Sequence, residues 1–162
     1  MAQQADDRTG HVRWFEDYVP GDVHELGRVT VDRDELVAFA QRYDPQPFHV
    51  DEAAAAQSPF GGLIASGWQT GSLMMRPLAD RYLSQASSLG SPGIDELRWL
   101  RPVRPGDVLS IRATVLEAAR SRSKPDRGLV RTLCEVRDTQ GNVVMSLKAL
   151  NLIRCRAADT AA

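Results

Sequence analysis

Apolar positions recur at helical spacing in residues 32–43, in the first third of the chain. The inner face of this predicted helix is formed by Leu36, Phe39, Ala40 and Tyr43. Asp32, with Glu35 three residues later, is typical of an N-cap. The helix therefore delivers Asp44 at its C-terminal end.

Two further helices are predicted after it. Asp51 caps a short one over residues 52–56, and a longer one runs through residues 66–83. In the longer helix Gly67 and Gly71 lie four residues apart on the face that continues with Met74 and Leu78. Small residues at the start of this face allow another layer to pack close to the helix backbone.

From Gly90 onward the hydrophobic period changes from about 3.6 to 2, which indicates strands. Strands are predicted over residues 24–31, 94–99, 109–115, 130–136 and 143–149, with a hairpin turn at 140–142. Helices followed by antiparallel strands predict an α+β fold. We expect a flexible tail over residues 1–13, one domain over 14–156 and a frayed end over 157–162.

Composition and charge narrow the functional classes. The 162 residues carry a formal charge of −1, so they lack the basic excess that a nucleic-acid partner requires. There is no long apolar run and no signal-like N-terminus, so we expect no membrane partner. Cys134 and Cys155 have no metal-type spacing and are interpreted as reduced thiols in a cytoplasmic protein.

Residues 43–49 bring an acid and an imidazole together on a stiff segment. Pro45 and Pro47 fix φ and remove two backbone donors, so the chain continues from the helix as an extended turn. Asp44 and His49 are five residues apart and form a minimal pair for moving a proton to and from water. The negative end of the helix dipole is expected to raise the pKa of Asp44.

These residues carry a family resemblance. The pattern Asp-x-Gln-Pro-Phe-His, an alanine-rich helix, and then Gly-Gly-Leu-Ile-Ala-Ser-Gly resembles the signature of the MaoC-like dehydratases, which include the R-specific enoyl-CoA hydratases. That family usually has asparagine where this chain has Gln46 and histidine where it has Ser66. The resemblance extends to residues 14–22 and 100–107.

The resemblance implies a hot-dog fold, with an antiparallel sheet wrapped around the long helix. It also implies reversible addition of water to a trans-2-enoyl-CoA, giving an (R)-3-hydroxyacyl-CoA. Asp44 and His49 would hold the catalytic water, and the backbone N–H of Gly67 would bind the thioester oxygen. No metal or redox cofactor is needed, and coenzyme A is part of the substrate. Ser66 could bind substrate or water, although a helix cap is the preferred interpretation.

Other residues have two possible roles each. Arg98, Arg101 and Arg104 recur every three residues and could contact the phosphates of coenzyme A or form a solvated edge. Met74 and Met75 could line an acyl pocket or belong to the core.

Two other functions fit the same fold. A hot-dog acyl-CoA thioesterase commonly carries an acid near the start of the long helix, where this chain has none before Asp80. A non-catalytic acyl-thioester binding subunit would have no need of both Asp44 and His49. Because open sheet edges need cover, we expect a homodimer or a higher homo-oligomer with sheets joined edge to edge.

Overall fold

A computed structural model describes residues 12–157. Residues 1–11 and 158–162, which include most of the two predicted flexible ends, lie outside the described residues. Five strands form one antiparallel sheet in the order β1-β3-β4-β5-β2. The strands are β1 (Val23–Thr30), β2 (Gly93–Trp99), β3 (Val108–Arg120), β4 (Arg127–Arg137) and β5 (Val143–Arg154).

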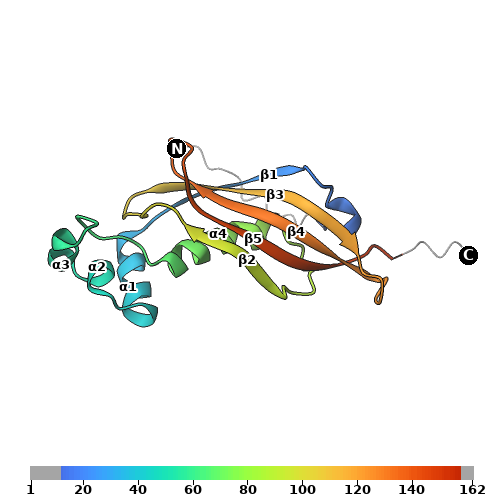
Figure 1. Ribbon diagram of the computed structural model, residues 1–162, viewed down its shortest axis with the longest axis horizontal. Coiled ribbons are helices and arrows are strands. Elements are labelled where there is room, and N and C mark those ends of the chain that lie inside the picture. The colour runs from blue at the N-terminus through green and yellow to red at the C-terminus, as the bar shows by residue number, and fades with distance from the viewer. Residues whose placement is uncertain (1–11, 158–162) are drawn as a thin grey trace, which may run out of the picture.

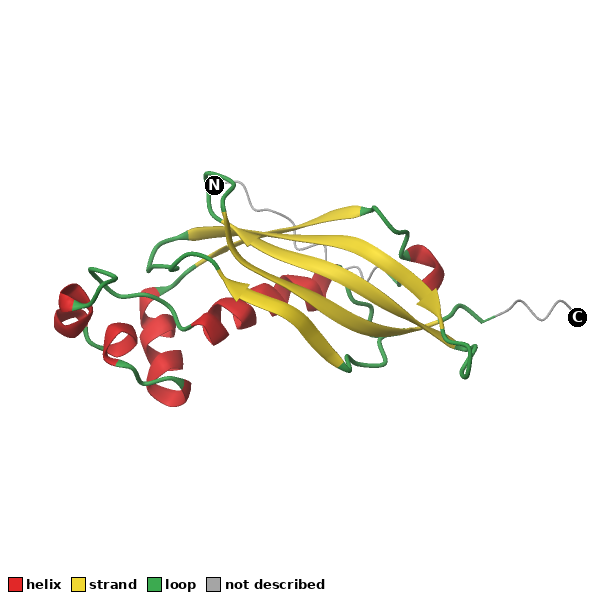
Figure 2. Cartoon of the chain, viewed as in Figure 1, coloured by secondary structure: helices red, strands yellow, loops and turns green. Residues whose placement is uncertain are grey.

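The long helix α4 (Gly67–Arg81) lies against one face of this sheet, which curves over it (Figure 2). Its residues Met74 and Leu78 are buried and join the inward residues of the strands in one hydrophobic core. Alternate positions of β3 and β4 are buried, as the period of 2 predicts. The predicted hot-dog fold is confirmed.

The remaining helices are α1 (Arg33–Tyr43), α2 (Pro47–Val50) and α3 (Glu52–Gln57). They gather beyond one end of the sheet, on the side where α4 begins (Figure 1). The two predicted acidic caps are confirmed: Asp32 accepts from the N–H groups of residues 34 and 35, and Asp51 accepts from that of residue 54. These caps fix where α1 and α3 start.

Two expectations about this region are wrong. The segment after Asp44 is not extended throughout, because Pro47 starts the one-turn helix α2, where its missing N–H costs no hydrogen bond. Tyr43 does not face inward with Leu36 and Ala40; it is 62% exposed and packs on Phe39. The inner face of α1 therefore ends one turn earlier than its spacing indicates.

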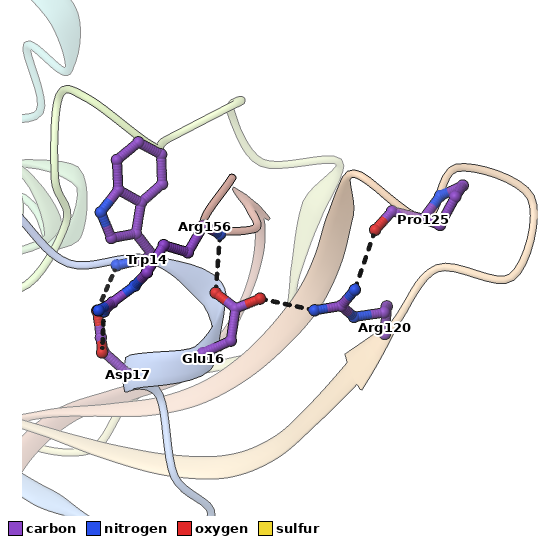
Figure 3. Close-up of polar contacts among 6 residues, drawn as sticks. All are labelled: Trp14, Glu16, Asp17, Arg120, Pro125 and Arg156. Atoms are coloured by element: carbon purple, nitrogen blue, oxygen red, sulfur yellow. Dashed lines mark hydrogen bonds and ion pairs between the residues drawn. The ribbon is translucent and has the colours of Figure 1, made fainter. Parts of the chain in front are cut away.

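A short 3-10 helix, η1 (Phe15–Asp17), ties the start of the described chain to its end. The carboxylate of Glu16 accepts from the backbone N–H of Arg156 at 2.9 Å and pairs with Arg120 at 2.6 Å (Figure 3). Asp17 pairs with the guanidinium of Arg156 at 2.6 Å. Arg13, assigned from the sequence to the flexible tail, lies over the rings of Tyr18 and Tyr82.

Both cysteines are buried free thiols, as expected from their spacing. Burial raises the pKa of Cys134 to about 12, so this thiol stays protonated and inert near neutral pH. Within the described residues, no helix is long and apolar enough to cross a membrane.

Candidate active site

Asp44 and His49 are brought together at the junction of α1, α2 and α4. Asp44 is the C-cap of α1, and His49 lies on the single turn of α2. The Nε2 atom of His49 is 3.4 Å from Oδ2 of Asp44, and both side chains line a cavity of about 530 Å³. The stiff segment with two prolines thus holds the pair on one side of a single cavity.

The orientation of the imidazole is set by a backbone carbonyl. Nδ1 of His49 lies 2.7 Å from the carbonyl oxygen of Ile64, and the ring is buried. Because a carbonyl oxygen only accepts, Nδ1 carries the proton in the neutral ring. Nε2 therefore presents its lone pair toward Asp44 and the cavity.

The electrostatics of Asp44 differ from the expectation. Gln46 donates to Oδ1 at 2.9 Å, and Ser66 donates to Oδ2 at 2.7 Å. These two hydrogen bonds, with a smaller effect of the nearby His49, lower the pKa of Asp44 in spite of partial desolvation. The prediction of a raised pKa is wrong because local donors outweigh the helix dipole.

Ser66 is also used differently from the prediction. It occupies the N-cap position of α4 but its side chain makes no capping hydrogen bond, since its hydroxyl donates to Asp44 instead. Its side chain is fully buried. Ser66 therefore links the start of the long helix to the carboxylate, 22 residues away in sequence.

Gly67 is the first residue of α4 and lines the cavity. An N–H at this position has no acceptor inside the helix, and the helix dipole adds positive potential there. The indole of Trp99 packs directly on Gly67, and a Cβ at this position would lie 2.6 Å from Nε1 of Trp99. A side chain at this position would therefore collide with the indole.

One of the three arginines of the predicted phosphate site lines the cavity directly. Arg101 lines the cavity. Arg104 donates to the carbonyl of Phe60 and so supports the loop that forms part of the wall. Arg98 is exposed on β2 and its guanidinium donates to the carbonyl of Leu97.

Sequence reasoning missed two parts of this site. Trp99 lies 32 residues from Gly67, and its role appears only when β2 lies beside the start of α4. The signal was the glycine itself, which indicates close approach of another layer without identifying it. The carbonyl of Ile64 as partner of His49 had no sequence signal at all.

Among the described residues, no cluster of three or more His, Cys, Asp or Glu side chains has the arrangement of a metal site. The prediction that the reaction needs no metal or redox cofactor stays a prediction.

Comparisons with known proteins identify the family of the chain. Residues 18–136 match the MaoC like domain family. The chain is 31% identical over 131 residues to a 3-hydroxybutyryl-CoA dehydratase of Methylorubrum extorquens, covering 76% of this chain and 73% of that protein.

Two solved structures are similar over most of their length. A MaoC-like dehydratase from Rhodospirillum rubrum has a TM-score of 0.83 and 39% identity, covering 91% of this chain and all of that one. The R-hydratase PhaJ1 from Pseudomonas aeruginosa has a TM-score of 0.72 and 26% identity, covering 88% and 86%.

Proposed function

The chain belongs to the MaoC-like dehydratase domain family, and on this premise we propose that it is an enoyl-CoA hydratase. It would add water reversibly to a trans-2-enoyl-CoA and give an (R)-3-hydroxyacyl-CoA. The observation that carries the proposal is the 3.4 Å approach of His49 Nε2 to Asp44 Oδ2 in a cavity that also includes Gly67. The relatives named as a 3-hydroxybutyryl-CoA dehydratase and an R-hydratase support the same reaction class.

The acceptor character of the pair suits the binding of one water. An ionised Asp44 and the unprotonated Nε2 of His49 both accept, so one water molecule can donate a hydrogen to each from about 2.8 Å away. Its oxygen lone pairs then face away from the pair, toward the bound substrate. Asp44 accepts such a hydrogen bond near neutral pH, because an aspartate is ionised there and Gln46 and Ser66 lower its pKa further.

The bond changes follow from this placement. The water oxygen bonds to C3 of the enoyl group as one O–H bond breaks and its proton passes to the pair. The C2=C3 π electrons move toward the thioester carbonyl, and C2 then takes a proton from the pair. Because two groups that share a water titrate together, base and acid roles belong to the pair and not to either residue. Such proton transfer contributes about 10²- to 10⁴-fold in rate.

Gly67 is the candidate for stabilising the charge on the thioester oxygen. Its N–H is the first of α4, where the helix dipole favours a developing negative charge. A preorganised donor of this kind typically stabilises the transition state by about 3 kcal/mol. Arg101, which lines the same cavity, is the candidate for a coenzyme A phosphate.

Hydration, hydrolysis and plain binding differ in what they do to crotonyl-CoA. We expect the purified protein to remove the enone absorbance without releasing free thiol, and the product to have the R configuration. Thiol release would indicate a thioesterase, although the only acid of α4 is the outward Asp80, which pairs with Arg76. Binding with neither change would indicate a non-catalytic subunit. Either result would reject the hydratase proposal.

A further inference from the structure

A second cavity lies beside the catalytic one. It has a volume of about 450 Å³ and runs between α4, β2 and β5. Its wall is mainly apolar, with Met74, Met75, Leu78, Leu97 and Leu147 among the lining residues. A saturated hydrocarbon chain is the ligand chemistry that such a wall favours.

The two cavities share three lining residues: Gly67, Trp68 and Trp99. The two indoles meet edge to face with ring centroids 5.3 Å apart. Trp99 is fixed further, because its Nε1–H donates to the carbonyl oxygen of Gly67 at 2.9 Å and its ring rests on the Cα of this glycine. The indole of Trp99 therefore stands between the two cavities, beside the proposed thioester site.

We propose that Trp99 is a specificity-determining residue that closes the catalytic cavity and restricts the enzyme to short acyl chains. This inference rests on the proposed function. With the indole in place, a four-carbon enoyl group fits on the side of Asp44 and His49, whereas the distal carbons of a longer chain meet the ring. The apolar cavity becomes continuous with the catalytic one when the indole is removed.

The expected size of the effect follows from hydrophobic transfer. Each methylene that leaves water for an apolar wall contributes roughly a fourfold gain in affinity. If the wild-type protein excludes the distal carbons of an eight-carbon chain, these carbons add no affinity. A variant without the indole gains part of it, so we expect a shift of at least about tenfold.

The first test compares crotonyl-CoA with trans-2-octenoyl-CoA as substrates of the wild type and of Trp99→Ala. The ratio of kcat/KM for the eight-carbon to the four-carbon substrate is expected to rise at least about tenfold in the variant. The ratio is the readout because loss of the indole also loosens Gly67 and lowers both rates. An unchanged ratio would overturn the proposal. This holds even if the variant differs from the wild type in oligomeric state.

Gly71 provides a matched control. It lines only the second cavity, and a Cβ at this position meets no atom within 4 Å. Gly71→Leu fills the second cavity from α4, so this single variant should hydrate crotonyl-CoA at the wild-type rate. In the double variant with Trp99→Ala it should remove the gain for trans-2-octenoyl-CoA. A gain that persists in the double variant would place the longer chain elsewhere and reject the proposal.

Binding of saturated thioesters tests whether Trp99 excludes longer acyl chains, and it needs neither turnover nor a variant. The wild type should bind octanoyl-CoA no more tightly than butyryl-CoA, because the extra carbons meet the ring of Trp99 and gain no apolar contact. Octanoyl-CoA binding ten times tighter than butyryl-CoA would mean that the second cavity is already open. If crotonyl-CoA is not hydrated but octanoyl-CoA binds no more tightly than butyryl-CoA, the proposed reaction is rejected, whereas the proposal that Trp99 closes the cavity is supported.

Discussion

At the scale of single residues, two donors hold the carboxylate of Asp44 in place and lower its pKa. Gln46 donates a hydrogen bond to one oxygen of the Asp44 carboxylate, and Ser66 donates to the other. Both donors lie outside helix α1, whose C-cap is Asp44. The serine that stands where the family usually has histidine is therefore part of the carboxylate's support. It bonds Asp44 directly, on the same oxygen that faces His49.

Ser66→Ala tests this support through the pH dependence of stability. A carboxyl whose folded pKa lies below its unfolded value of about 3.9 stabilises the fold above that pH. This contribution is lost as the pH falls through the lower folded pKa. Removing one donor should raise the pKa of Asp44 and cost about 1–2 kcal/mol at pH 7, with a smaller cost once Asp44 is protonated.

The measurement is the free energy of unfolding of wild type and Ser66→Ala at pH 7 and at a pH below the folded pKa of Asp44, which an NMR titration of this carboxyl provides. A loss of stability that is equal at both pH values, with an unchanged titration of Asp44, would mean that Ser66 acts only by packing.

How far the residue chemistry could be predicted depended on sequence distance. Asp44 and His49, five residues apart, were identified correctly as neighbours because the intervening prolines restrict the chain. The pKa of Asp44 was predicted in the wrong direction because two hydrogen bonds were not foreseen: one from Gln46, two residues away, and one from Ser66, 22 residues away. The effect of the helix end on Asp44 could be judged from the sequence, whereas the contact with Ser66 depends on the packing of α4 against α1.

At the scale of elements, the start of α4 connects the catalytic cavity with the edge of the sheet. The indole from β2 lies on Gly67, whereas Gly71, one turn later, has open space at its Cβ position. The expectation that both glycines admit a close layer is thus correct for Gly67 and not for Gly71. The sequence spacing of the two is equivalent, so only the placement of β2 distinguishes them.

Substituting each glycine by alanine separates these roles. Gly67→Ala places a Cβ 2.6 Å from Nε1 of Trp99, so the indole must leave Gly67 and its hydrogen bond to the carbonyl oxygen. We expect crotonyl-CoA hydration to fall by about tenfold or more, since the oxyanion donor loses its fixed position. Gly71→Ala should keep wild-type hydration and raise helix stability by up to about 1 kcal/mol.

The measurements are the steady-state rate of crotonyl-CoA hydration and the thermal unfolding of Gly67→Ala and Gly71→Ala, each compared with the wild type. Equal rates for Gly67→Ala and the wild type would show that the contact with Trp99 has no part in catalysis.

Elements were easier to predict than the segments between them. The alternating strands and both acidic caps were predicted from side-chain pattern alone, because burial of one face and satisfaction of helix N–H groups are local requirements. The one-turn helix α2 was missed because four residues are too few to show a hydrophobic period.

At the scale of the whole molecule, the β2 edge of the sheet carries exposed apolar side chains within the described residues. Strand β2 is an edge strand. Its residues Ile94 and Trp99 and the α4 residues Trp68 and Met75, all of which also line the outer side of the second cavity, are each at least 46% exposed. The strand bulges between Asp95 and Arg98, with Glu96 at φ 53°, and so departs from a regular ladder there. Apolar exposure at an edge strand favours a second copy of the chain as its cover.

We therefore expect a homodimer that joins two β2 edges. Sedimentation of the wild type should give twice the chain mass at micromolar concentration, and Ile94→Lys should give the monomer because a charge at the joint is costly to bury. Asp34→Asn, on an exposed side chain of α1, serves as a control and should remain dimeric. A monomeric wild type, or an Ile94→Lys variant with unchanged mass, would move the interface away from β2.

The central claim is that Asp44 and His49 act together on one water molecule. It is tested most directly by the rate of crotonyl-CoA hydration for wild type, Asp44→Asn and His49→Gln, with Asp34→Asn as a distant carboxylate control. Each site variant should lose about 10²- to 10⁴-fold in turnover with a nearly unchanged melting temperature, while the control keeps the wild-type rate. Wild-type turnover in either site variant would contradict the claim.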